Sequence, residues 1–124
     1  MTQGASVAID FDHLRQYTGG DDALVADVLT MFTDGTARWL SALDPAADDA
    51  TWSGVAHALK GSALTVGATG LGEVCERAEA MVGEGDWTAR REWAVEEIAA
   101  RVADVQAEIG RWMYDYDLKR LRDQ

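Results

Sequence analysis

The chain has 124 residues, 48% of them hydrophobic, and a formal net charge of −11. This length predicts a single domain with a substantial core, and the abundance of alanine and leucine beside a single proline favours an all-α fold. A chain this acidic lacks the basic surface that nucleic acid or an anionic membrane requires, so we expect neither partner and interpret the charge as an aid to solubility.

The cysteine content and the hydropathy pattern indicate a cytoplasmic protein. Cys75 is the single cysteine, so no disulfide can form within the chain, which suits a reducing compartment. The amino-terminal residues have neither the basic nor the apolar region of a secretory signal. No apolar run approaches the roughly 18 residues that a membrane span needs.

The first elements in chain order are a flexible leader and a short helix. We assign residues 1–9 to the leader and residues 10–124 to one helical domain. Asp10 can accept backbone hydrogen bonds at the start of the short helix, and the pair Gly19-Gly20 stops it. The apolar residues of this helix are Phe11, Leu14 and Tyr17.

A longer second helix follows, with Asp21 and Asp22 at its acidic start and Pro45 as its terminator. Gly35, near the middle, weakens the helical pattern. Its apolar residues recur at helical spacing, which predicts one core-facing stripe. They are Leu24, Val25, Val28, Leu29, Phe32, Leu40 and Leu43.

The third predicted helix spans about residues 49–66 after a connector at 44–49, and Asp48 or Asp49 caps it. Its apolar stripe consists of Trp52, Val55, Ala56, Leu59, Ala63 and Val66. The next break lies at 67–70. A fourth helix then runs to the stop at Gly83-Glu84-Gly85. Its inward residues are Leu71, Val74, Cys75, Ala78, Met81 and Val82.

The last predicted helix begins after Asp86 and covers about residues 87–116. A helix of about 30 residues is about 45 Å long, longer than its neighbours, so we expect residues 114–122 to protrude or fray. Its apolar face holds Ile98, Val102, Val105, Ile109 and either Trp112 or Met113. The four longer helices and their short loops predict an antiparallel up-down four-helix bundle, with the short first helix as a lid.

His57 stands out in the third helix because it points away from the core. At helical periodicity it lies about 150° from the centre of the apolar stripe. Lys60 and Gly61 lie one turn further along the same surface, and Gly54 lies one turn back. Because a glycine inside a helix costs about 1 kcal/mol relative to alanine, two glycines here suggest that something approaches this surface closely.

These residues carry a resemblance to a known family. The segment His57-Ala58-Leu59-Lys60-Gly61-Ser62 resembles the H-x-L-K-G-[SA] signature of histidine-containing phosphotransfer (HPt) domains of bacterial-type phosphorelays. The resemblance covers about residues 10–87. It includes Val66-Gly67-Ala68 with Leu71, and the segment Cys75-Glu76-Arg77-Ala78-Glu79, which resemble the family's next helix.

The resemblance implies a helical bundle that acts as a phosphoryl carrier and not as an enzyme of its own. His57 would accept a phosphoryl group from an aspartyl phosphate on a response-regulator receiver domain and donate it to the aspartate of another. The receiver would supply Mg²⁺ and most catalytic groups, so we expect no cofactor on this chain. We also expect a monomer. The sequence leaves open whether the chain is free-standing or a piece of a hybrid histidine kinase.

A phosphoryl-accepting histidine must be exposed, with a free neutral ring nitrogen, a nearby cation and no bulk on the approach side. His57, Lys60, Gly54 and Gly61 meet these needs at the level of sequence. The alternative is an ordinary surface histidine beside a solvated lysine, which the signature in register disfavours. His13, the other histidine, has no lysine-glycine partner and is interpreted as structural or merely exposed.

Two further residues complete the predicted docking surface around Gly54 and Gly61. Leu64, two turns from His57 on the same side, either seeds a hydrophobic docking patch or is an ordinary exposed leucine. Ser53, one turn back, hydrogen-bonds the imidazole or, as we favour, faces water.

Two other functions stay open at this point. The chain lacks a Gly-rich loop for ATP and any zinc pattern, so we expect neither autophosphorylation nor a metal centre. The first alternative is the phospho-accepting domain of a chemotaxis-type kinase, phosphorylated in trans. The second is a non-phosphorylated helical adaptor that binds receivers, which has no reason to keep His57.

Overall fold

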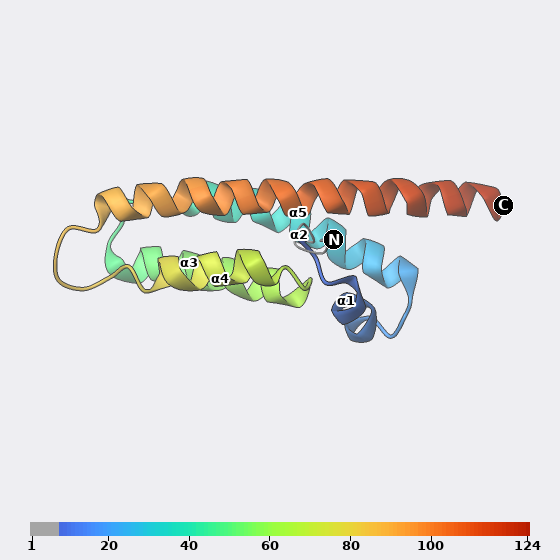
Figure 1. The fold of residues 1–124 in the computed structure, drawn as a ribbon, viewed down its shortest axis with the longest axis horizontal. Coiled ribbons are helices and arrows are strands. Elements are labelled where there is room, and N and C mark those ends of the chain that lie inside the picture. Colours follow the sequence, from blue (N-terminus) through green and yellow to red (C-terminus); the bar gives the residue numbers. More distant parts are fainter. Residues whose placement is uncertain (1–7) are drawn as a thin grey trace, which may run out of the picture.

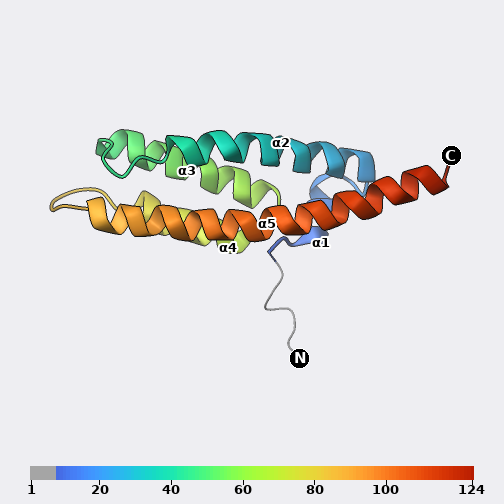
Figure 2. The same ribbon diagram turned by 90° about the horizontal axis from the view of Figure 1, so that it is seen from above.

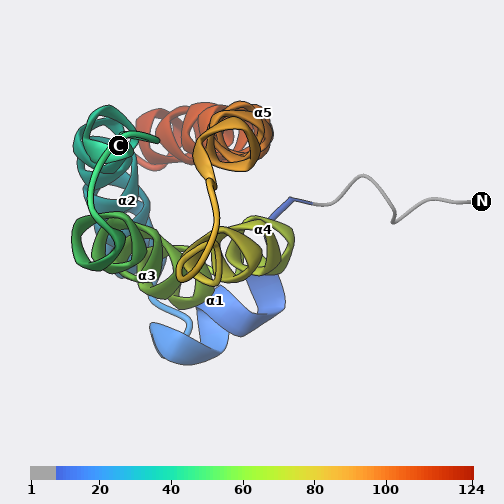
Figure 3. The same cartoon turned by 90° about the vertical axis from the view of Figure 1, so that its left-hand side faces the viewer.

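The computed structural model describes residues 8–124, and within them helices joined by loops are the only regular secondary structure, which confirms the predicted all-α fold. The helices are α1 (Phe11–Tyr17), α2 (Asp22–Ala42), α3 (Asp49–Thr65), α4 (Thr69–Glu79) and α5 (Thr88–Arg122). Helices α2 to α5 run up and down as a four-helix bundle (Figure 1). Viewed from its end, α2 and α3 form one side, and α5 and α4 form the other (Figure 3).

Helix α1 lies across the end of the hairpin that α3 and α4 form, which confirms the predicted lid (Figure 1). Its attachment is specific: the backbone N–H of Asp10 donates to the carbonyl of Gly67, in the loop between α3 and α4. Gly67 adopts a positive φ of 79°, and a Cβ there would lie 2.7 Å from the carbonyl oxygen of Asp10. A glycine is therefore required where the lid meets the hairpin.

The helix starts follow the predicted aspartates. Asp10, Asp21 and Asp48 each accept backbone hydrogen bonds as N-caps of α1, α2 and α3. The choice between Asp48 and Asp49 is thus settled in favour of Asp48. A buried core fills the space between the helices, and the indole N–H of Trp52 donates to the carbonyl of Ala78 at 2.7 Å.

Three predicted boundaries need correction. Helix α2 runs unbroken through Gly35 and ends at Ala42, before Pro45. Helix α4 ends at Glu79, so Met81 and Val82 pack against the core from the following loop and not from a helix. Helix α5 continues to Arg122, because nothing in its sequence breaks the helix where its apolar stripe ends.

The predicted leader, residues 1–9, falls mostly outside the described residues. Its last two residues are described, and they are anchored and not loose. The backbone N–H groups of Ala8 and Ile9 both donate to the carboxylate of Glu108 on α5, and Ile9 is fully buried. The ordered domain therefore begins earlier than predicted.

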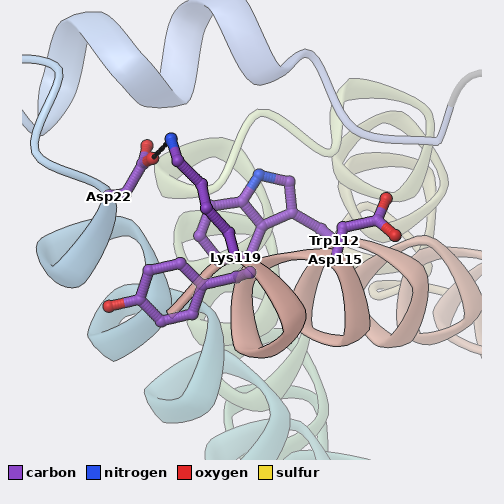
Figure 4. A pocket seen from close by; sticks show the side chains of 5 residues that line it. Asp22, Trp112, Asp115 and Lys119 are labelled. Carbon is purple, nitrogen blue, oxygen red and sulfur yellow. Dashed lines mark ion pairs between the residues drawn. The ribbon is translucent and has the colours of Figure 1, made fainter. Parts of the chain in front are cut away.

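The carboxyl-terminal part of α5 extends beyond the bundle, as expected, and stays helical (Figure 2). It still contacts the start of α2, where Lys119 lies 3.9 Å from Asp22. The rings of Trp112 and Tyr116 stack there with centroids 5.1 Å apart. These residues and Asp115 line an open pocket of about 220 Å³ (Figure 4).

At the opposite end, Arg91 of α5 joins two loops that sequence reasoning did not connect. Its buried guanidinium donates to the carbonyls of Ala47 and Met81 at 2.8 and 3.0 Å, and to Asp49 at 2.7 Å. It also lies over the ring of Trp52, 5.0 Å from the centroid. Within residues 8–124, no helix combines the length and apolar character that crossing a membrane requires.

Candidate functional site

The side chain of His57 projects from the middle of α3 into solvent and is 69% exposed. Its near neighbours in the helix, Ala56 and Leu59, are fully buried. Because they hold the opposite side of α3 against the core, the imidazole of His57 points outward. The outward direction inferred from helical spacing is therefore confirmed. The imidazole lies on the side of α3 that borders α4.

Glu79, at the end of α4, holds the imidazole. Nδ1 of His57 lies 3.0 Å from Oε2 of Glu79. An ionised carboxylate can only accept a hydrogen bond, so Nδ1 carries the proton and the lone pair of the neutral ring resides on Nε2. Within residues 8–124, Nε2 has no hydrogen-bond partner. The arrangement therefore presents one free, nucleophilic nitrogen.

Lys60 lies one turn beyond His57, as predicted, but its ammonium is paired with Glu76, 3.6 Å away. Its side chain is only 26% exposed, so its aliphatic part packs on the surface while the charged group reaches the edge of the site. The cation is thus positioned one turn from the imidazole without contacting it. Sequence reasoning missed both glutamates, because their roles depend on how α3 and α4 align.

Gly54 and Gly61 leave the surface on both sides of His57 open. Both glycines are exposed, and a Cβ built on either would meet no atom within 4 Å. Neither glycine is therefore needed for packing within the part of the chain that the structure describes. Their shared effect is to keep the approach to the imidazole free of side chains.

The other two predicted docking residues differ in their environment. Ser53 is half-buried, and no hydrogen bond joins it to His57. Leu64 is partly exposed and rests on α4, where a Cβ on Gly72 would lie 2.8 Å from its Cδ2. The absence of a side chain at Gly72 therefore leaves the space on α4 that the Leu64 side chain occupies.

A separate apolar groove lies where the end of α3 meets α1 and α2, with a volume of about 290 Å³. Met31 is 72% exposed at its edge, and Tyr17 is 62% exposed. The remaining lining residues are Val28, Phe32, Ser62, Thr65 and Val66. Thr65 lies about 12 Å along the helix axis from His57.

Two other candidates lie outside this arrangement. His13 is exposed on α1, and its imidazole has no partner among the described residues. Cys75 is buried in α4, and burial raises the pKa of its thiol to about 12, so it is unreactive. Of the two histidines, His57 is thus the one whose imidazole is both exposed and held by a partner within the described residues.

Comparison with known proteins identifies a family and a solved structure to which this chain is similar. The family model of the Hpt domain matches residues 27–109, a range that contains His57, Lys60, Gly61 and Glu79. The crystal structure of histidine phosphotransferase ShpA from Caulobacter crescentus is similar, with 32% sequence identity and a TM-score of 0.73. The similarity covers 93% of this chain and 99% of that chain. No curated protein matches.

Proposed function

The chain belongs to the Hpt domain family, and from this premise we propose that His57 is its phosphoryl-accepting residue. Membership supports a phosphotransfer role in a phosphorelay. The proposal adds the donor and the acceptor: His57 takes the group from the aspartyl phosphate of one receiver domain and delivers it to the aspartate of another. The observation that carries it is the exposed imidazole whose Nδ1 is held by Glu79.

The hydrogen bond to Glu79 supports a definite transfer step. The lone pair of Nε2 attacks phosphorus, and the bond from phosphorus to the aspartyl oxygen of the donor breaks, which leaves a carboxylate on the receiver. Nδ1 keeps its proton, so the phosphorylated ring carries a positive charge. The carboxylate of Glu79, 3.0 Å away, balances that charge. Attack by a second receiver's aspartate on phosphorus reverses the step and returns the neutral ring.

Lys60 and the receiver share the stabilisation of the phosphoryl group in this proposal. In the proposal, Lys60, which now pairs with Glu76, exchanges that contact for one to a phosphoryl oxygen after transfer. Mg²⁺ and the remaining catalytic groups belong to the receiver, so the carrier needs no cofactor of its own. The carrier therefore supplies a nucleophile, a cation and a docking surface.

The docking surface surrounds His57 and continues into the apolar groove. Gly54 and Gly61 let the receiver's active site close over the imidazole without meeting a side chain. Leu64 and Met31 offer exposed apolar contacts beside it. A receiver that contacts this surface brings its aspartate to Nε2. We place the exchange in the cytoplasm, where receivers and a hybrid histidine kinase are available partners.

Two incubations distinguish this function from its alternatives. The purified chain is mixed with a phosphorylated receiver domain, and separately with histidine kinase domains and ATP. We expect phosphorylated His57 in the first mixture. Phosphorylation only by a kinase domain with ATP would indicate the phospho-accepting domain of a chemotaxis-type kinase. Receiver binding without any phosphoryl transfer would indicate an adaptor, and either result would contradict the proposal.

A further inference from the structure

Three pairs of neighbouring residues join α3 to α4 in one register, along the surface that carries His57. The pairs in this interhelical row are His57 with Glu79, Lys60 with Glu76, and Leu64 with Gly72. Each step forward along α3 matches an equal step backward along α4, because the two helices lie side by side and antiparallel (Figure 3). The packing of the hairpin thus places two carboxylates of α4 beside His57 and Lys60.

The two charged pairs of the interhelical row lie one helical turn apart. His57 and Lys60 are separated by three positions on α3, as Glu76 and Glu79 are on α4. Residues at this spacing have Cβ atoms about 5–6 Å apart. At such distances charges interact appreciably even near a solvated surface, so a new charge on the imidazole acts on the other three side chains.

Glu76 draws the ammonium of Lys60 toward α4. Nζ of Lys60 lies 3.6 Å from Oε1 of Glu76, and within residues 8–124 it forms no other ion pair. Arg77, the neighbouring cation on α4, lies 3.7 Å from Glu97 of α5 and is therefore engaged elsewhere. The cation that would stabilise a phosphoryl group is thus held by a carboxylate while His57 is unmodified.

The charges of the four side chains make this carboxylate unfavourable once a phosphoryl group arrives. Before transfer, a neutral imidazole, an ammonium and two carboxylates carry one net negative charge. The phosphoryl group adds close to two negative charges, and the ring that keeps its Nδ1 proton gains one positive charge. Glu79 balances the ring at 3.0 Å. Glu76 is then the carboxylate that opposes the phosphoryl charge and competes with it for Lys60.

We propose that Glu76 limits how strongly His57 holds its phosphoryl group, by keeping Lys60 paired with a carboxylate. Glu76 is a positioning residue in this account, because it acts through Lys60 and not on the reacting nitrogen. A phosphoryl group that is held less strongly is given up more readily, so Glu76 prepares the carrier to donate to a second receiver. The inference rests on the proposed function, since it concerns the phosphorylated state of the same histidine.

The mobility of the lysine side chains tests the pairing without any phosphorylation. The chain has two lysines, Lys60 and Lys119, so carbon labelling of lysine gives two signals that are readily assigned. We expect the NMR order parameter of the Lys60 Cε to fall in Glu76→Gln, because the ammonium loses its partner, while that of Lys119 stays the same. An unchanged order parameter for Lys60 would overturn the inference.

The equilibrium with phosphoramidate measures how strongly His57 holds the phosphoryl group, and it needs no receiver. Nε2 attacks phosphorus and ammonia leaves, so fixed concentrations of phosphoramidate and ammonia define a ratio of phosphorylated to unmodified His57. We expect Glu76→Gln to raise this ratio about two- to fivefold, the range that an exposed ion pair allows. Glu73→Gln removes the same charge from an exposed position on α4, and as the matched control it should have a clearly smaller effect.

The Lys60→Ala background decides whether Glu76 acts through Lys60. Glu76→Gln has no cation to release there, so most of its effect on the ratio should disappear. An unchanged ratio in Glu76→Gln, an equal rise in Glu73→Gln, or an equal rise without Lys60 would each overturn the inference. The expected ratios in a chain that accepts nothing from phosphorylated receivers would contradict the proposed donor alone, whereas a His57 that phosphoramidate does not modify would overturn both.

Discussion

Nδ1 of His57 and Oε2 of Glu79 lie 3.0 Å apart and join the middle of α3 to the end of α4. The two residues are 22 positions apart, so the contact exists only because α3 and α4 pack antiparallel. It selects the tautomer with a proton on Nδ1 and a lone pair on Nε2. The contact thereby fixes the orientation of an exposed imidazole, as the proposed transfer step requires.

Loss of this contact should slow phosphorylation without unfolding the bundle. In Glu79→Ala the ring is free to rotate and to exchange tautomers, so we expect reaction with phosphoramidate to slow by about tenfold, as after loss of an orienting partner. Nitrogen NMR shifts of the imidazole should show a smaller share of the Nδ1-protonated tautomer. Glu73→Ala, on the same helix, is the control. Unchanged shifts and rate in Glu79→Ala would contradict the orienting role.

Lys60 should assist transfer to a smaller extent. Its ammonium is paired with the carboxylate of Glu76, 3.6 Å away, and this pairing weakens the stabilisation that it can give to the phosphoryl charge. We expect Lys60→Ala to slow receiver-to-His57 transfer, or to shorten the phosphohistidine lifetime, by a factor of about two to five. Lys119→Ala, which removes the other lysine, should have no effect. Equal rates and lifetimes in all three proteins would show that Lys60 is an ordinary surface residue.

Substitution of Gly61 should separate stability from docking. Because a Cβ at this position meets nothing within 4 Å, Gly61→Ala should raise the free energy of unfolding by up to about 1 kcal/mol. Gly61→Gln should fold equally well, yet slow transfer from a receiver more than Gly61→Ala does, since its side chain stands where the receiver closes. Reaction with phosphoramidate should change much less. Ala37→Gln serves as the control for a glutamine on an exposed helix turn.

A normal receiver rate in Gly61→Gln would place the docking surface elsewhere. An unfolded Gly61→Gln protein would show instead that the glycine is a packing contact.

Asp49 should make the stability of the bundle depend on acidity. The backbone N–H of Gly83 and the guanidinium of Arg91 both donate to its carboxylate and hold its pKa below the ordinary value of 3.8. A lowered pKa in the folded state stabilises the fold above pH 3.8, and this contribution disappears as the pH falls through the lowered value. Asp49→Asn should therefore melt at a lower temperature than the unchanged protein at neutral pH.

The same difference in melting temperature should shrink as the pH falls below 3.8. Asp34→Asn, at an exposed position on α2, should show no such pH-dependent difference. A difference for Asp49→Asn that stays constant across this pH range would exclude the linkage.

Local signals in the sequence sufficed for the bundle and for the outward direction of His57. The aspartate caps and the apolar spacing are properties of single helices, and they predicted each helix start within about two residues. The ends were harder: α4 stops at Glu79 although Met81 and Val82 continue its pattern, because a loop can bury the same residues. The spacing of apolar residues in the sequence therefore does not distinguish a longer helix from a loop that packs on the core.

The partners of the site residues could not be predicted, because they depend on the alignment of separate helices. Glu79 and Glu76 were visible as part of a family-like segment, but only the packed α3–α4 hairpin brings them to His57 and Lys60. Arg91 is a similar case, since its acceptors come from two loops far apart in the sequence. Met31 gave no signal, because a single exposed methionine becomes part of a groove only beside α1 and α3.

Transfer from a phosphorylated receiver to the His57→Gln protein tests the central claim most directly. The unchanged protein and His13→Gln, which removes the other histidine, should both acquire a label that is acid-labile and stable in alkali, as a phosphoramidate is. His57→Gln should keep its helical content and acquire none, because its amide has no nucleophilic lone pair on nitrogen. Label that persists on His57→Gln, or that disappears in His13→Gln, would contradict the assignment of His57 as the phosphoryl carrier.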